Sequence, residues 1–232
     1  MFDLPRLRDR VRVFRDRAHG GQVLAGMLED YRGSQALVLA VPAGGVPVAA
    51  VVAKELGLPL DVAVVSKITL PWNSEAGYGA VAFDGTVRLN EVLVRQVRLS
   101  DQDIQRGTAE TKEKVAARVQ ALRGDRPLPE LAGRTIVLID DGLASGFTMR
   151  VAVEALRNAE TGRIVLAVPT GHEASVRMLK DHVEVVYCPN IRGGWRYAVA
   201  DAYERWWDVD MREVERILAQ FTSAPPQASA DG

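Results

Sequence analysis

Five short apolar runs are spaced along the chain. They are rich in Val, Leu and Ile and lack the polar alternation of a strand with one solvent-facing side. Strands covered on both faces have this pattern, which is typical of parallel sheets. We therefore predict a buried, mostly parallel sheet. Its strands are residues 36–41, 61–65, 135–139, 163–168 and 183–187.

Helical patterns separate these runs. They cover residues 21–31 before the first run, 46–56 after it, 148–158 after the third and 173–180 after the fourth. The helix over 46–56 is followed by Gly57, a residue that suits the position after a helix C-terminus. Strands that alternate with helices imply βαβ units, so we predict an α/β fold with a doubly wound sheet.

Two regions interrupt this alternation. Residues 69–88 are rich in Gly and predict a loop that runs into a short hairpin, followed by a long helix over 101–122 that Ser100 caps. Residues 189–207 combine Gly, Arg and aromatic side chains. The tail, residues 222–232, is rich in Ser, Ala, Pro and Gln, a composition that predicts disorder.

Composition narrows the class of protein. The 232 residues suit one domain, and a formal net charge of −1 gives no overall field that would attract nucleic acid or a membrane surface. No apolar run reaches the roughly 18 residues that a membrane span requires, and the N-terminus lacks the apolar segment of a signal peptide. The one cysteine, Cys188, excludes a disulfide framework within the chain, so a cytoplasmic location is expected.

The strongest candidate for a site is D-D-G-L-A-S-G-F-T, residues 140–148. An apolar strand ends in two carboxylates, a loop of small residues follows, and a helix then begins. In open α/β sheets ligands bind beyond the carboxyl ends of the strands. The small residues allow the backbone N–H groups to approach an anion, and the following helix adds the positive end of its dipole. We therefore predict a phosphate site in this loop.

Individual residues in this stretch have different expected roles. Ser145 and Thr148 can donate hydroxyl hydrogen bonds to the same phosphate. Asp140 and Asp141 would repel an anion, so they fit a place beside it, where they accept hydrogen bonds from ribose hydroxyls with Mg²⁺ nearby. A Walker A loop is excluded because no Lys follows Gly146. A tight turn in which the acidic pair only caps the helix, or an unrelated α/β phosphate-binding enzyme, stays as an alternative.

The stretch resembles the PRPP-binding signature of type I phosphoribosyltransferases. The resemblance implies that Asp140 and Asp141 act in catalysis by holding the ribose diol. It also implies that the 5-phosphate is bound by a run of six residues, namely Leu143, Ala144, Ser145, Gly146, Phe147 and Thr148. It extends over most of 14–218 and is closest to a group of bacterial and archaeal predicted phosphoribosyltransferases. We expect a domain at 14–221 with a variable hood near 188–207, a flexible lid hairpin and an N-terminal extension, 1–13.

The resemblance also marks a pyrophosphate side. The stretch V-P-A-G-G-V-P-V-A, 41–49, matches the family's pyrophosphate loop, so Ala43, Gly44 and Gly45 are expected to bind pyrophosphate together with the catalytic candidate Lys67. Two positions depart from the related sequences, which have a basic residue where Ala43 stands and Arg before the Lys where Ser66 stands. Residues 71–81 resemble the family's mobile loop, in which Glu75 is a candidate for holding Mg²⁺ or substrate.

The base would be recognised by the hood. By a looser similarity to hypoxanthine–guanine phosphoribosyltransferase, Trp195 and Tyr197 are expected to bind the base by stacking, and Asp201 to join Asp140 and Asp141 near the metal. These aromatic residues are equally consistent with packing inside a small subdomain. The purine enzymes also carry a Lys on the preceding strand, and the comparable stretch 166–170 has none, so a 6-oxopurine acceptor is unsupported.

The resemblance as a whole implies a Mg²⁺-dependent phosphoribosyltransferase, expected as a homodimer, that transfers ribosyl phosphate from PRPP to a nitrogenous base in nucleotide salvage. Because Ala43 and Ser66 remove basic partners on the pyrophosphate side, a catalytically weak PRPP- or nucleotide-binding regulatory protein is the alternative.

Overall fold

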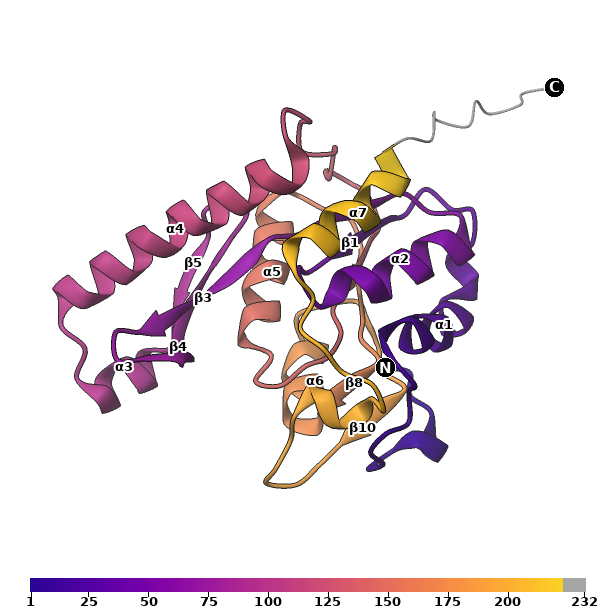
Figure 1. Cartoon of the computed structure of the whole chain (residues 1–232), viewed down its shortest axis with the longest axis horizontal. Helices are drawn as coiled ribbons and strands as arrows, with labels where there is room; N and C mark the ends of the chain where they lie inside the picture. The colour runs from indigo at the N-terminus through magenta and orange to yellow at the C-terminus, as the bar shows by residue number, and fades with distance from the viewer. Residues whose placement is uncertain (223–232) are drawn as a thin grey trace.

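A computed structural model describes residues 1–222 of the chain, except for the side chains of Glu75 and Thr222 (Figure 1). The tail expected to be disordered lies outside these residues apart from Thr222, and the candidate role of the Glu75 side chain likewise falls outside them. In the described part of the chain no helix is long and apolar enough to cross a membrane.

The body is built on a five-stranded sheet with the order β2-β1-β6-β7-β9, and every neighbouring pair is parallel. Residues of β1, β6, β7 and β9 are buried throughout, as apolar runs without polar alternation predict. The strands are β1 (Leu37–Ala40), β2 (Leu60–Val62), β6 (Ile136–Ile139), β7 (Ile164–Ala167) and β9 (Val185–Tyr187).

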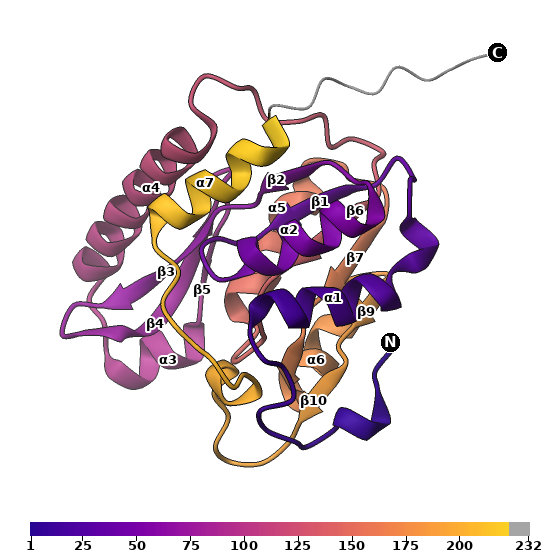
Figure 2. The ribbon, with the colours of Figure 1, turned by 45° about the vertical axis from the view of Figure 1, so that its right-hand side comes forward.

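Helices cover both faces of this sheet (Figure 2). On one face the sheet packs with α1 (Arg17–Met27), α2 (Gly45–Leu56) and α7 (Met211–Thr222). On the other it packs with α5 (Phe147–Asn158) and α6 (Glu173–Lys180). The predicted α/β fold with a doubly wound, mostly parallel sheet is therefore confirmed. Successive strands are added on opposite sides of the β1–β6 pair, so the switch point of the topology lies between β1 and β6.

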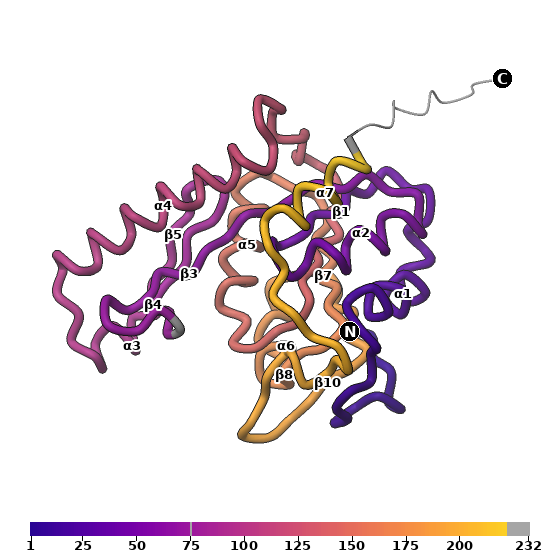
Figure 3. The backbone as a smooth tube through the Cα atoms, in the orientation of Figure 1, coloured from indigo at the N-terminus to yellow at the C-terminus, as the bar shows by residue number. Residues whose placement is uncertain are grey.

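An arm of antiparallel structure projects from the body (Figures 1 and 3). Its sheet has the order β3-β4-β5, and two helices follow in the chain. The elements are β3 (Val65–Leu70), β4 (Asn73–Ala82), β5 (Val87–Leu89), α3 (Glu91–Val97) and α4 (Asp101–Arg123).

The arm corrects two details of the prediction. The run 61–65 is not one strand, since β2 ends at Val62 and β3 begins at Val65, and the short hairpin is a three-stranded sheet. The full length of β4 was not predicted because the strand consists mainly of small residues. Gly79 is needed there because a Cβ would lie 2.7 Å from the Arg88 carbonyl oxygen on β5.

The N- and C-terminal segments meet beside the sheet. Two short parallel strands, β8 (Thr170–His172) and β10 (Asn190–Arg192), lie next to the 3₁₀ turn η3 (Val199–Ala202), and β10 and η3 fall within 188–207, the segment predicted as the hood. The N-terminal segment, with the turn η1 (Pro5–Leu7), runs along the edge strand β9, where the Phe2 N–H donates to the Val186 carbonyl at 2.8 Å. α1 begins at Arg17, earlier than predicted, because the Asp16 side chain caps it. It ends at Met27, and the last predicted helical residues form the separate 3₁₀ turn η2 (Glu29–Tyr31).

Candidate active site

Two loops meet at the carboxyl edge of the sheet, one on each side of the switch point. The loop after β1 carries Ala43 and Gly44 into α2, and the loop after β6 carries Asp140 and Asp141 toward α5. Crevices at such switch points are where open α/β sheets bind ligands. The topology therefore brings together two segments, far apart in the sequence, that the sequence analysis assigned to one site.

The acidic pair is held close and largely buried. The Asp141 N–H donates to Asp140 Oδ1 at 2.8 Å, and Arg17 Nε donates to Asp141 Oδ2 at 2.9 Å. Burial raises the pKa of Asp140 well above its ordinary value, and the neighbouring Asp141 charge raises it further. Burial also raises the pKa of Asp141, while the Arg17 charge acts in the opposite direction. The pair is thus poised to accept a cation or hydrogen-bond donors.

Glycines in the loop after β1 allow it to touch the acidic pair. A Cβ on Gly44 would lie 2.0 Å from Asp141 Oδ2, and one on Gly45 would lie 2.7 Å from the Ile139 carbonyl oxygen. Neither approach is open to a residue with a side chain. The peptide bond between Pro42 and Ala43 in this loop is cis. The two loops consequently form a single unit.

The loop from Leu143 to Thr148 ends at the N-terminus of α5. Gly146 adopts φ +71°, and α5 starts at Phe147, so the N–H groups of the first turn have no partner within the helix. The Ser145 hydroxyl accepts from the Phe147 N–H at 3.3 Å, and Thr148 lies in the first turn. Helix N-terminal N–H groups, two hydroxyls and the positive end of the helix dipole favour an anion here.

Neighbouring strands and helices support this loop. The Leu143 N–H donates to the Thr170 carbonyl at 3.0 Å, and the His172 N–H donates to the Leu143 carbonyl at 2.8 Å. Ser175, in the first turn of α6, donates its hydroxyl to the Ala144 carbonyl. The loop is therefore fixed by β8 and α6 at its buried side.

The hood brings one of its two aromatic candidates near the loop. Tyr197 is half-buried, and its hydroxyl donates to Thr170 Oγ1 at 3.3 Å. The hood packs directly on the acidic loop, because a Cβ on Gly142 would lie 2.5 Å from Val199. Trp195 is instead fully exposed, on the outer side of a surface hollow of about 340 Å³ that His172 also lines.

Asp201 has a partner of its own in this structure. Its carboxylate pairs with Arg192 at 3.3 Å and is half exposed. Within residues 1–222 no group of three or more Asp, Glu, His or Cys side chains gathers in a way that could hold a metal ion. The chain itself thus offers the two adjacent carboxylates of Asp140 and Asp141. Mg²⁺ is commonly bound by one or two carboxylates, with water and ligand oxygens completing its shell, so these donors fit Mg²⁺.

Lys67 lies on β3 of the arm rather than at the end of a strand of the main sheet. It pairs with Ala80, and alternation along β3 places it on the same face as Val65, which packs against α5. Ser66 faces the other way, is buried and accepts a hydrogen bond from Arg118 at 3.3 Å. Lys67 therefore lies on the face of the arm that Val65 turns toward α5, and Ser66 lies on the other face.

Comparison with known proteins assigns the chain to a family. A family model described as "Phosphoribosyl transferase domain" matches residues 80–202, more than half of the 232 residues. The chain belongs to the phosphoribosyl transferase family. This confirms the family that the loop at 140–148 indicated.

Individual members of the phosphoribosyl transferase family are also similar. Proteins from two strains of Mycobacterium tuberculosis, each named "Putative phosphoribosyl transferase", are 35% identical over 208 residues, which is 90% of this chain and 47% of each relative. The chain therefore spans about half the length of these curated relatives. The solved structure of the protein TT1426 from Thermus thermophilus has 34% identity and a TM-score of 0.73, covering 90% of this chain and 98% of that one.

Sequence reasoning missed several residues of this candidate site. Arg17 reaches Asp141 from 124 positions away, and the Tyr203 hydroxyl donates to the Asp141 carbonyl at 2.6 Å. Ser175 supports the phosphate loop. Arg17 stands in a strongly charged stretch, 15–17, in which nothing in the sequence distinguishes it from the exposed Arg15. Only the fold identifies it.

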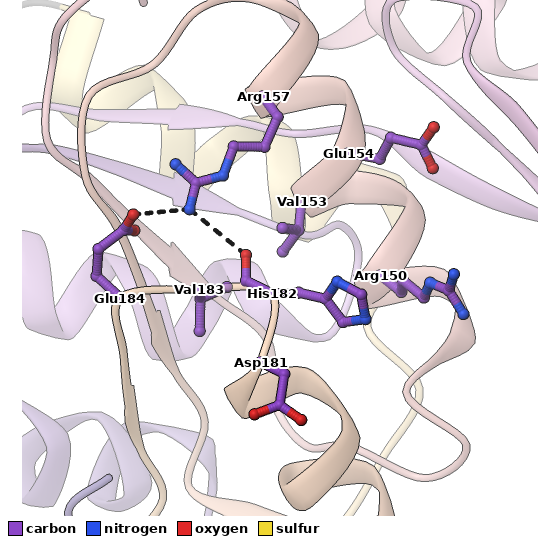
Figure 4. Close-up of a pocket in the computed structure, with 8 residues that line it drawn as sticks. All are labelled: Arg150, Val153, Glu154, Arg157, Asp181, His182, Val183 and Glu184. Carbon is purple, nitrogen blue, oxygen red and sulfur yellow. Dashed lines mark hydrogen bonds and ion pairs between the residues drawn. The ribbon is translucent and has the colours of Figure 1, made fainter.

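A second polar hollow, of about 480 Å³, lies elsewhere on the phosphoribosyl transferase domain (Figure 4). It is lined by the outer side of α5 and the segment before β9, which places it at the opposite edge of the sheet. Its principal charges are already paired, since Arg157 meets Glu184 at 2.7 Å and Glu154 meets Arg88 at 2.7 Å. This hollow is not part of the candidate site.

We expect Asp140→Asn to raise the thermal stability of the protein at neutral pH. Because burial and Asp141 raise the folded-state pKa of Asp140, the folded protein binds more protons than the unfolded chain between the ordinary carboxyl pKa and the raised one. Stability therefore falls as the pH rises through that window, and an uncharged amide removes this loss. Asn keeps an oxygen that can accept from the residue 141 N–H. The expected rise in Tm is roughly 2–4 °C, the shift that about 1 kcal/mol produces in a chain of this size.

Thermal unfolding followed by circular dichroism between pH 4 and pH 8 measures this effect. The difference in Tm between the variant and the wild type should grow with pH. A variant that is less stable than the wild type at every pH would show that the Asp140 charge is compensated in the folded protein.

Proposed function

We propose that this chain is a Mg²⁺-dependent phosphoribosyltransferase that transfers ribosyl phosphate from PRPP to a nitrogenous base. The observation that carries the proposal is the contact between the two loops at the switch point. There Gly44 touches the Asp141 carboxylate, and the N-terminus of α5 follows shortly along the chain. A ligand that joins a sugar diol to phosphate groups on two sides fits such a site. Family membership supports the same reaction class.

Each part of the site has a role in this proposal. The backbone N–H groups and hydroxyls of residues 143–148 hold the 5-phosphate, and Asp140 and Asp141 accept hydrogen bonds from the ribose hydroxyls. Residues 43–45, with Lys67 from the arm, bind the pyrophosphate. Asp140 and Asp141 would hold Mg²⁺, which would supply positive charge to offset that of the departing pyrophosphate.

The chemistry asks the protein mainly for positioning. The bond between ribose C1 and the pyrophosphate oxygen breaks, pyrophosphate leaves with the bonding electrons, and a base nitrogen bonds to C1 from the opposite face. The proton of that nitrogen passes to the departing pyrophosphate or to water. The Asp140 and Asp141 carboxylates favour the positive charge that develops on the ribose in the transition state, and exclusion of water prevents hydrolysis of the reacting sugar. Tyr197, half-buried beside Thr170, is the better placed of the two aromatic candidates for contact with the base, because Trp195 lies on the outer surface.

A catalytically weak PRPP- or nucleotide-binding regulator is the second candidate. Ala43 brings no charge to the pyrophosphate loop, and the Ser66 side chain is turned toward Arg118 on α4. Both observations remove positive charge from the pyrophosphate side, which weakens catalysis more than it weakens binding of the ribose 5-phosphate part. The regulator therefore predicts tight nucleotide binding with little turnover.

The decisive assay measures pyrophosphate release. Purified protein is incubated with Mg²⁺, PRPP and each member of a panel of purines, pyrimidines and related heterocycles. The proposal expects base-dependent release that EDTA abolishes and that Thr148→Ala reduces. Nucleotide or PRPP binding in calorimetry without release for any base would favour the regulator, and neither binding nor release would reject both.

Three further expectations accompany the proposed reaction. We expect a role in nucleotide salvage, a cytoplasmic location and a homodimer. The arm offers exposed apolar side chains, including Trp72 and Val92, for an interface between two copies. Light scattering on the purified protein measures the mass that tests the dimer.

A further inference from the structure

Arg17 occupies an unusual place for an arginine. It lies in the first turn of α1, far from the phosphate loop in sequence, and its side chain is only 4% exposed. Arginine is almost never buried to this degree unless its charge is paired. The contacts that compensate it therefore show what the side chain does.

The guanidinium makes three contacts with fixed geometry. Nε donates to Asp141 Oδ2 at 2.9 Å, and Nη1 donates to the Trp207 carbonyl at 2.7 Å. The group lies over the Trp206 ring, with Cζ 3.8 Å from the ring centroid. Two hydrogen bonds and a stacked face leave the planar group no freedom to turn.

These contacts tie a segment of the hood to the acidic pair. Residues 204–210, which we call the strap, run from the hood to α7 (Figure 3). The strap is fastened to the chain before α1, because the Glu204 N–H donates to the Phe14 carbonyl at 2.8 Å and the Arg205 N–H to the Arg15 carbonyl at 2.9 Å. The guanidinium of Arg17 therefore contacts the strap through Trp206 and Trp207 and contacts Asp141 through Nε.

The orientation of Asp141 is what this arrangement determines. Arg17 engages one carboxylate oxygen, Oδ2, and the contact with Gly44 leaves that oxygen no room to move toward the loop after β1. A carboxylate has two oxygens with about four acceptor positions in total, so Oδ1 keeps the capacity to accept from a ligand hydroxyl. Without Arg17 the carboxylate would be free to rotate about its last side-chain bond.

We propose that Arg17 is a positioning residue for recognition of the sugar, which fixes the Asp141 carboxylate so that it accepts a hydrogen bond from a ring hydroxyl of the ligand. This inference rests on the proposed function only in requiring a ribose 5-phosphate group in the site. It does not require transfer to a base. The side chain acts through Asp141 and makes no contact with the ligand in this role.

The test compares two ligands that share a phosphate and differ in their hydroxyls. Ribose 5-phosphate carries the ring hydroxyls, and tetrahydrofurfuryl phosphate has the ring and the phosphate alone. Calorimetry with each ligand gives a preference ratio for the wild type, for Arg17→Ala and for Arg17→Lys. The wild type should prefer the sugar by at least about 10- to 100-fold, the range given by one hydrogen bond to a charged group.

Arg17→Ala should lower this ratio toward one, because only Asp140 then keeps its orientation, and leave the affinity for tetrahydrofurfuryl phosphate nearly unchanged. Arg17→Lys keeps the positive charge but lacks the planar guanidinium with its several N–H donors, so it should give an intermediate ratio. Guanidinium ion added to Arg17→Ala should restore part of the preference. A general loss of structure would lower both affinities together, so a ratio unchanged from the wild type in both variants would overturn the proposal.

Arg123 provides a matched control. Its side chain is 5% exposed and pairs with Asp61, whose side chain is 14% exposed. The exposed fractions of Arg17 and Asp141 are 4% and 14%. Arg123 also donates to a carbonyl, that of Val62, at 2.7 Å. Arg123→Ala should lower the Tm and keep the wild-type preference ratio. Loss of the preference in Arg123→Ala as well would show that any buried arginine has this effect and would overturn the role of Arg17.

The same data separate this inference from the proposed transferase. A wild type that releases pyrophosphate from PRPP but whose sugar preference survives Arg17→Ala would reject the inference alone. A sugar preference that Arg17→Ala removes, in a protein that transfers nothing, would reject the transferase alone. A wild type that binds neither ligand would reject both.

Discussion

Asp141→Asn should lower the stability of the protein and its affinity for ribose 5-phosphate together. The substitution leaves the Arg17 guanidinium buried opposite an uncharged amide, and breaking a buried ion pair from one side typically costs about 3–5 kcal/mol. Burial of Asp141, which raises its own pKa, and the Asp140 charge next to it both offset part of this cost, so we expect a loss of about 2 kcal/mol, or a fall in Tm of roughly 4–8 °C. Loss of a charged acceptor should weaken ribose 5-phosphate binding by about 10- to 100-fold.

Asp140→Asn is the matched comparison, since it makes the same chemical change one residue away. Its Tm should rise where that of Asp141→Asn falls, because Arg17 pairs with Asp141 and not with Asp140. Both shifts can be measured in one set of melting curves. Two variants with the same direction of shift would contradict the assignment of Arg17 to Asp141.

Gly44→Ala should have an equally large effect on the site. The added Cβ would lie 2.0 Å from Asp141 Oδ2 and 2.6 Å from its Cγ, distances at which the carboxylate must move. Displacement of Asp141 would break its contact with Arg17 and disturb the loop after β1. We expect a loss of about 2–4 kcal/mol in the free energy of unfolding and ribose 5-phosphate binding weakened by at least about 100-fold.

Gly26→Ala is the control for this substitution. Gly26 lies in α1 with no atom within 4 Å of the position of an added Cβ. An Ala at such a helical position should raise the stability by up to about 1 kcal/mol and leave binding unchanged. Denaturant unfolding and calorimetry on both variants provide the measurements. A Gly44→Ala protein that binds like the wild type would show that the two loops are not in contact.

The sheet was predictable because its strands report burial through composition alone. Val38 and Leu138 belong to runs that are apolar on both faces, and only a covered parallel strand explains such runs. The arm was less predictable because β4 is made of small residues. Gly77 and Gly79 let the neighbouring strands β3 and β5 approach closely. A strand with so few large apolar residues cannot be recognised from hydrophobicity in the sequence.

The phosphate loop was predictable because its chemistry is local. A strand end, two carboxylates and a helix N-terminus follow one another within residues 135–148, so no distant contact is needed to interpret them. Arg17 could not be predicted, since its role depends on α1 lying against the carboxyl edge of β6. The hood was predictable in part. Its aromatic residues are evident in the sequence, but only the folded chain shows that Tyr197 is half-buried and Trp195 is exposed.

A crystal structure with ribose 5-phosphate bound tests the assignment of the loop most directly. We expect the phosphate to lie at the N-terminus of α5, within hydrogen-bond distance of N–H groups in residues 143–148 and of the Thr148 hydroxyl. The ring hydroxyls should face Asp140 and Asp141, with Arg17 still on Asp141 Oδ2. A phosphate bound at another place, or a sugar whose hydroxyls point away from the acidic pair, would contradict the proposed site.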